Sequence, residues 1–140
     1  MDPDERHGGE TEAEQAASNA RLALRRSGIV PIEPDATVAV MLQPGEPLLA
    51  ARRAAQLERQ PAESRSASPR VGDLYLTDRR LIHLGTPCTD LPLDAIREAE
   101  ATDEWLLLRI SGAEGLRIRV ADPRVLRVAI AAARTAGRSR

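Results

Sequence analysis

Two short apolar segments separated by a polar corner constrain the fold of this chain more than any other feature. They lie between Gly72 and Gly85, on either side of the polar residues Thr77 to Arg80. Strand-like apolar runs that are joined by a short turn and bounded by glycine are typical of a β-hairpin. The sequence therefore predicts a hairpin here, and with it an antiparallel sheet.

The corner of this hairpin resembles the L-T-D-x-R-L-I pattern of bacterial pleckstrin-homology-like (PH-like) and GRAM-type domains. The matching residues are Leu76, Thr77, Asp78, Arg80, Leu81 and Ile82. Further matches occur in the order of that family: a lead-in over residues 42–49, a strand over 91–96, a last hairpin and a closing helix. The resemblance implies a mainly β fold, a bent antiparallel sheet or barrel capped by one C-terminal helix.

Local propensity and the resemblance disagree over residues 48–57. This alanine-rich and arginine-rich segment has the intrinsic propensity of a helix. The resemblance implies the first strand of the domain, and we expect a strand because tertiary context overrides local preference. PH-like domains usually have seven strands, so either Thr37 to Leu42 or Arg97 to Thr102 must supply one more. The polar residues 58–70 are expected to form a mobile loop between the first two strands.

The length of 140 residues suits one domain with tails. Residues 1–17 contain six acidic side chains and little that can enter a core, which is typical of disorder. Residues 11–26 are rich in good helix formers. We therefore expect an acidic, largely disordered segment over 1–34 with a helix over 11–26, a domain over 35–137, and a tail over 138–140.

Alternating apolar residues over 105–110 and 116–120 predict two strands with one buried face each. Opposed residues of an antiparallel pair share a face. We therefore match Ile110 with Leu116, Leu108 with Ile118 and Leu106 with Val120, which leaves residues 112–114 or slightly more as the loop. This register sets Arg109 opposite Arg117, and Leu107 opposite Arg119, on the outer face.

Asp122 and Pro123 are typical of a helix start, and the residues that follow them predict an amphipathic helix. At about 100° per residue, arginines 124, 127, 134 and 138 lie on one side. The other side has the residues expected to face the sheet: Val125, Leu126, Ala129, Ala132 and Ala133.

Charge is segregated along the chain. The net charge is -1, yet residues 105–140 contain eight arginines against Glu114 and Asp122. The candidate binding face combines the outer side of the last hairpin with the arginine side of the helix: Trp105, Leu107, Arg109, Arg117, Arg119, Arg124 and Arg127. Such a face suits lipid headgroups, an acidic protein segment or the chain's own acidic tail, and the alternative is an ordinary solvated surface.

Composition argues against several other functions. A near-neutral charge and only two aromatic residues, Trp105 and Tyr75, argue against nucleic acid as a partner. The lysine and arginine motif with which eukaryotic PH domains bind phosphoinositides is not carried over, because the chain has no lysine. The single cysteine allows no intramolecular disulfide. Without a signal or membrane-spanning segment, we expect a cytoplasmic protein, soluble or peripheral at the inner membrane face.

Catalytic and metal sites have little support in the sequence. His83, Cys88 and Asp90 are close together, but nothing indicates a positioned base and an oxyanion site. We expect a small buried thiol beside a strand histidine, no cofactor and no metal. The predicted function is a non-catalytic module that binds an unknown protein partner or acts as a scaffold. The alternative is peripheral binding to anionic membrane through the arginine-rich C-terminal half.

Overall fold

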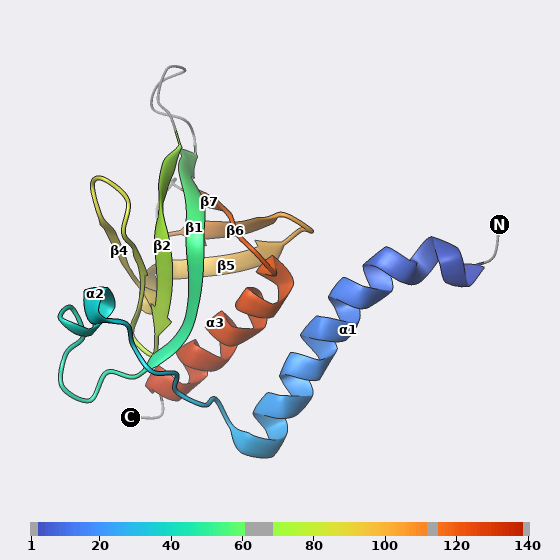
Figure 1. Cartoon of the computed structure of the whole chain (residues 1–140), viewed down its shortest axis with the longest axis horizontal. Coiled ribbons are helices and arrows are strands. Elements are labelled where there is room, and N and C mark those ends of the chain that lie inside the picture. Colours follow the sequence, from blue (N-terminus) through green and yellow to red (C-terminus); the bar gives the residue numbers. More distant parts are fainter. Residues whose placement is uncertain (1–2, 61–68, 112–114, 139–140) are drawn as a thin grey trace.

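The computed structural model describes residues 3–60, 69–111 and 115–138, and within these ranges the chain forms one sheet and three α-helices (Figure 1). The elements in chain order are α1 (Pro3–Ser27), α2 (Ala36–Ala39), β1 (Leu48–Gln60), β2 (Arg70–Thr77), β3 (Arg80–His83), β4 (Thr89–Pro92), a 3-10 turn (Leu93–Ala95), β5 (Ile96–Ala101), β6 (Trp105–Ile110), β7 (Gly115–Arg119) and α3 (Pro123–Arg138).

The strands follow the order β4-β3-β2-β1-β7-β6-β5 across the sheet. The predicted hairpin is confirmed as β2 and β3, with Tyr75 opposite Ile82. The sheet is strongly bent, so that β5 and β6 run across the direction of β1 and β2 (Figure 1). It is not closed into the expected barrel: among the described strands, β4 and β5 are edges that do not pair with each other. Strand β4 is only four residues long, and the turn Leu93–Ala95 separates it from β5.

Strand β1 confirms the strand predicted for residues 48–57 against their helical propensity. It pairs with β2 from Leu48 to Leu57 and with β7 from Gln56 to Gln60. These neighbours on both sides supply the tertiary context that outweighs local preference. Because β1 reaches Gln60, the predicted loop is shorter at its start than expected, and its middle, residues 61–68, lies outside the described residues.

The middle of β1 contains a bulge. Its register with β2 shifts between Arg52 and Ala55. Within the bulge, Ala54 has a φ of 51°, in the left-handed region, and its N–H donates to Asp73 Oδ1 at 3.0 Å. Bulges of this kind bend a strand and increase its twist, and this one lies in the longest strand of the sheet.

The remaining strand comes from the second of the two predicted segments. Residues 96–101 form β5, which pairs with β6. The other candidate, Thr37 to Leu42, is not a strand, because it contains the short helix α2. The carboxylate of Asp35 caps that helix by accepting from the Val38 N–H at 2.9 Å, and it also accepts from the Tyr75 hydroxyl at 2.7 Å.

Helix α3 closes the core, as predicted. Leu126, Ile130 and Ala133 are buried and belong to one apolar cluster with both halves of the bent sheet. That cluster includes Leu57 and Leu76 on one side of the bend, and Ile96, Leu106 and Ile118 on the other. The helix ends at Arg138, and residues 139 and 140 of the predicted tail lie outside the described residues.

Helix α1 begins at Pro3, well before the predicted start at residue 11, where we expected mostly disorder. Its C-terminal half lies beside α3, with Ala17 buried, while its N-terminal half extends past the domain (Figure 1). Within the described residues, the C-terminal half of α1 is therefore the part that contacts α3. No helix in the described part of the chain is both long and apolar enough to cross a membrane.

Candidate functional site

The corner of the central hairpin, which carries the family-like motif, is built around the Thr77 hydroxyl. This hydroxyl donates to Glu46 Oε2 at 2.8 Å and accepts from the backbone N–H groups of Arg79 and Arg80, each at 3.0 Å. The same Glu46 carboxylate accepts from the Gln43 N–H at 2.9 Å. The hydroxyl thus fixes the turn and joins it to the Pro-Gly-Glu lead-in.

Arg80 completes this network with its whole guanidinium. Its Nε and Nη2 each donate to the Glu46 carboxylate at 2.9 Å, which is the bidentate geometry of strong arginine pairs. Its Nη1 donates to Asp90 Oδ2 at 2.7 Å and its Nη2 to the Met41 carbonyl at 2.6 Å. Arg80 therefore ties three separate segments together, and Asp78 lies buried beside it in the turn.

The electrostatics of this corner follow from burial and pairing. Burial raises the pKa of Glu46, but the hydrogen bonds from Arg80, Gln43 and Thr77 outweigh it and lower the pKa to about 2. The hydrogen-bonded ion pair with Glu46 also raises the pKa of Arg80 above its usual value. The hairpin residues Leu76, Thr77, Asp78, Arg80 and Leu81 thus have structural roles in this chain. The sequence prediction did not single out Glu46, although a buried arginine in the corner requires a carboxylate partner.

The predicted residues of the last hairpin gather on the outer side of β6 and β7, which we call the Trp105 face: Trp105, Leu107, Arg109, Arg117 and Arg119. Trp105 and Leu107 are half-buried. The guanidinium of Arg117 lies over the Trp105 ring, 4.3 Å from its centroid. A cation at this distance is attracted to the ring face, so the two side chains hold each other in place.

Each arginine of the Trp105 face has a carboxylate partner on this chain. Arg117 forms an ion pair with Glu58 of β1, with its Nε 2.9 Å from Oε2. Arg109 lies 3.5 Å from Glu98 of β5, and Arg119 lies 3.5 Å from Glu104. The face is therefore charge-balanced, whereas we expected it to be cationic.

The predicted register of β6 and β7 was wrong by two residues. Leu106 lies opposite Ile118, Leu107 opposite Arg117 and Arg109 opposite Gly115. Ile110 pairs with Ile96 of β5 instead of with Leu116. A shift of two residues keeps each side chain on its predicted face, so the alternation pattern does not distinguish the two registers. The connection is longer than residues 112–114, which lie outside the described residues.

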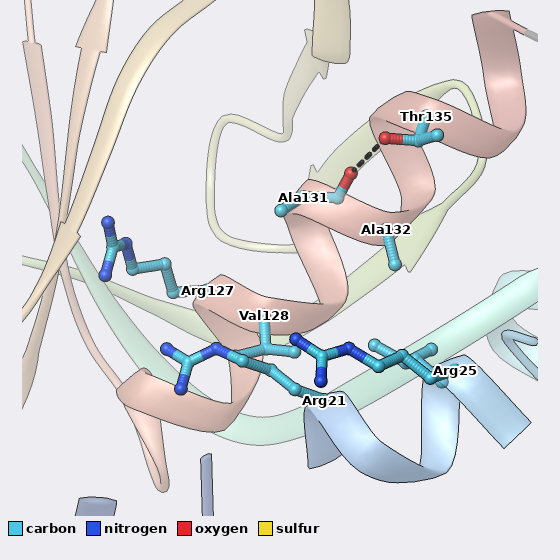
Figure 2. Close-up of a pocket in the computed structure, with 8 residues that line it drawn as sticks. Arg21, Arg25, Arg127, Val128, Ala131, Ala132 and Thr135 are labelled. Carbon is cyan, nitrogen blue, oxygen red and sulfur yellow. Dashed lines mark hydrogen bonds between the residues drawn. The ribbon is translucent and has the colours of Figure 1, made fainter. Parts of the chain in front are cut away.

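Arg124 and Arg127 lie on α3 and not on the Trp105 face. Arg124 pairs with Asp103 at 3.2 Å, and the Nε of Arg127 donates to the Ala99 carbonyl at 2.8 Å. Arg127 also lines a groove between α1 and α3, with its guanidinium directed away from Arg21 and Arg25 (Figure 2). The candidate binding face of the sequence prediction is thus divided between two surfaces.

The α1–α3 groove has a volume of about 400 Å³, an apolar floor and a cationic rim. Its floor is made of Leu24, Val128, Ala131 and Ala132, and its rim of Arg21, Arg25 and Arg127 (Figure 2). A second hollow of about 320 Å³ continues it past Glu14 and Ser18, and the two hollows share Arg21 and Arg127. In the described part of the chain, nothing forms a hydrogen bond or ion pair with Arg21 or Arg25.

The histidine and cysteine weighed as a catalytic pair lie in different environments. His83 is 1% exposed, and its Nε2 lies 2.8 Å from the carbonyl oxygen of Ala55, so this nitrogen carries the proton. The expectation of a buried thiol was wrong: Cys88 is exposed, because it lies in the turn before β4 and not in a strand. Within the described ranges, no group of His, Cys, Asp or Glu side chains is arranged to hold a metal ion.

Comparisons with known proteins bear on the fold. No protein-family model and no curated protein matches the sequence. Among solved structures, the Vps36 N-terminal PH domain is similar to this chain, with a TM-score of 0.50 over 64% of this chain and 83% of that domain, at 16% sequence identity. The fold is PH-like.

A second similar structure is the C-terminal domain of an unknown protein from Leishmania infantum, at 13% identity and a TM-score of 0.44, over 59% of this chain and 76% of that one. The Vps36 domain and the seven-stranded order of the sheet confirm the PH-like fold that the hairpin motif implied. At this level of identity the likeness concerns the fold alone, since one fold supports many unrelated functions. The bacterial and GRAM-type assignment stays a prediction.

Proposed function

We propose that this PH-like chain is a non-catalytic interaction module that binds a protein partner, or acts as a scaffold, through its Trp105 face. The observation that carries the proposal is the pairing of Arg109, Arg117 and Arg119 with carboxylates around a half-buried tryptophan. Tryptophan and arginine are the residue types that dominate the energetics of protein interfaces. A pre-formed arrangement also reduces the entropy that is lost on binding.

The charge balance favours protein over lipid on this face. Membrane attraction adds about 1 kcal/mol for each free basic residue near an anionic surface. An arginine that already has a carboxylate partner must either break that ion pair or bring the negative charge of the carboxylate to the membrane. The free energy that such an arginine gains from the anionic surface is therefore smaller. Paired charges at the rim of a protein interface instead help to orient the partner.

The proposal includes two finer assignments. The L-T-D-x-R-L corner at residues 76–81 and the order of the other motifs support a bacterial PH-like protein of the GRAM-like type. The single cysteine, Cys88, allows no intramolecular disulfide and is exposed, which supports action in the reducing cytoplasm.

Site-specific photo-crosslinking in cells tests the proposal. A benzophenone amino acid at Leu107 is expected to give one discrete protein adduct, which is lost when Trp105→Ala is added. The matched control places the same group at Val40, which is 85% exposed and lies next to α2. Adducts of equal yield from both positions, or from neither, contradict the proposal.

The second candidate is peripheral binding to the inner membrane face. The supporting observation is that Arg21 and Arg25 have no hydrogen-bond or ion-pair partner within the residues that the structure describes. Cosedimentation with phosphatidylcholine vesicles, with and without phosphatidylglycerol, distinguishes protein binding from membrane binding. The interaction-module proposal expects no salt-sensitive binding to the anionic vesicles. Salt-sensitive binding that is lost in Arg21→Ala/Arg25→Ala, together with no adduct from position 107, favours the membrane function instead.

A further inference from the structure

Helix α1 has opposite charges at the two ends of one stripe. With 3.6 residues per turn, positions 10, 14, 21 and 25 lie on the same side of a helix. The sequence places glutamate at 10 and 14 and arginine at 21 and 25. Arg21 and Arg25 line the α1–α3 groove, and Glu14 and Arg21 line the adjoining hollow, so three of the four stripe positions border these two hollows.

We propose that two copies of this chain associate by antiparallel pairing of their α1 helices along this stripe. A two-fold axis between Ala17 and Ser18 sets Glu14 of each copy against Arg21 of the other. The same register sets position 10 against Arg25 of the second copy. Because the interface is isologous, each contact occurs twice, and the stripe is complementary to itself with no change in the fold.

A second copy is favoured as the occupant because its acidic residues can neutralise the arginines of the groove. The groove offers cations without partners in the described residues, and the N-terminal half of α1 extends past the domain with acidic residues in its sequence (Figure 1). In the antiparallel pair, that half lies over Leu24 and Val128 of the second copy. Ser18, which is small and exposed at the centre of the stripe, allows the two helices to approach closely, while Ala17 remains packed against α3 of its own copy.

The outer sheet face offers no comparable site for this acidic segment. Its arginines 109, 117 and 119 are occupied by Glu98, Glu58 and Glu104. In the described residues, Arg21 and Arg25 of the groove have no partner, and the groove also has an apolar lining that a helix can cover. Both the charge of the acidic half of α1 and its position beyond the domain therefore favour binding at the α1–α3 groove.

Charge reversal in two variants tests the pairing, with the full chain throughout. In Arg21→Glu/Arg25→Glu the stripe is wholly acidic, and in Glu10→Arg/Glu14→Arg it is wholly basic. Each variant alone is expected to be monomeric by sedimentation velocity. An equimolar mixture is expected to form a heterodimer, because every contact then joins opposite charges.

The wild-type chain is expected to be dimeric at about 0.05 M salt and to dissociate at least about tenfold more readily at about 0.5 M, where the charges are screened. The matched control is Glu12→Arg/Arg26→Glu, which makes the same exchanges on the opposite side of α1 and is expected to leave the association unchanged. Far-UV circular dichroism checks that each variant is folded.

Two results overturn the proposal. A folded wild-type chain that stays monomeric at low salt and about 0.1 mM, equivalent to a binding free energy weaker than about -5.5 kcal/mol, contradicts the pairing and leaves the groove to an acidic segment of another protein. A mixture of the two folded variants that does not associate shows that dimerisation, if present in the wild type, uses another surface.

Discussion

Thr77 satisfies three partners with one hydroxyl group. As a donor it contacts a buried carboxylate, and as an acceptor it receives two backbone N–H groups of the turn. A buried polar group that loses its partner costs far more than the hydrogen bond contributes net. The effect of a substitution here therefore depends on whether the hydroxyl is kept.

Replacing Thr77 with valine is expected to destabilise the fold by about 2–3 kcal/mol, because the change of shape is small but the turn N–H groups lose their acceptor. Thr77→Ser keeps the hydroxyl and is expected to cost less than about 1 kcal/mol. Urea denaturation of the three proteins measures the difference. Equal losses in the two variants contradict the role of the hydroxyl.

The low pKa of Glu46 makes stability depend on pH. Because its pKa falls from 4.5 to about 2 on folding, the stabilisation is fully present above pH 4.5. It is lost as the pH drops through the folded value, so the affected window is about pH 4.5 to 2. The shift corresponds to a contribution on the order of 3 kcal/mol.

Glu46→Gln is expected to flatten the loss of stability across this window while lowering stability at neutral pH. Urea midpoints measured at intervals from pH 6 to 2 give the comparison. Glu98→Gln, at an exposed position of β5, is the matched control and is expected to keep the wild-type slope. An unchanged slope in Glu46→Gln is the result that contradicts the assignment.

At the scale of elements, β1 shows how a strand is made from residues that favour a helix. Pairing with β2 and β7 determines its conformation, and the bulge at Ala54 lets it curve where the sheet bends. An alanine at a φ of 51° is strained, since its Cβ crowds the backbone. Glycine has no such conflict at this position.

Ala54→Gly is therefore expected to stabilise the fold by about 0.5–1 kcal/mol, because relief of the strain exceeds the entropy that glycine adds to the unfolded chain. Ala51→Gly, in the same strand but without positive φ, is expected to destabilise by a similar amount. Guanidinium denaturation compares the two variants. A change of the same sign in both contradicts the strain at residue 54.

The sequence patterns predicted which face of each strand is buried better than they predicted which residues pair across neighbouring strands. The hairpin corner and the alternation in β6 and β7 correctly indicated strands and buried sides. They did not distinguish two registers of β6 and β7 that differ by two residues. The ion pairs with Glu58 and Glu98 were not foreseen because they depend on the pairing of β7 with β1 and of β6 with β5, which alternation does not reveal. Propensity alone would have made β1 a helix, and only the resemblance favoured a strand. The groove was not predictable because it depends on how α1 lies on α3.

At the scale of the whole molecule, one apolar cluster joins the two halves of the bent sheet through α3. Leu126 is 1% exposed at the centre of that cluster. Trp105, the single tryptophan, lies on the outer side of the sheet and reports on β6. If the core is continuous, local and global probes must report the same transition.

Leu126→Ala is expected to lose about 2–5 kcal/mol through the cavity it leaves. Tryptophan fluorescence and far-UV circular dichroism are expected to give coincident midpoints in both the wild type and the variant. Leu22→Ala, at a half-exposed position of α1, is the control and is expected to cost less than about 1 kcal/mol. Separate midpoints for the two probes contradict a single cooperative unit.

The ion pair between Arg117 and Glu58 joins residues 59 positions apart in the sequence. A substitution that removes one charge leaves the other unneutralised beside Trp105, so natural selection acts on the two positions jointly. Lineages that change one are expected to change the other in compensation. The adjacency of β1 and β7 is thus expected to appear among homologues as correlated substitution at positions 58 and 117, where a single sequence shows only two distant residues.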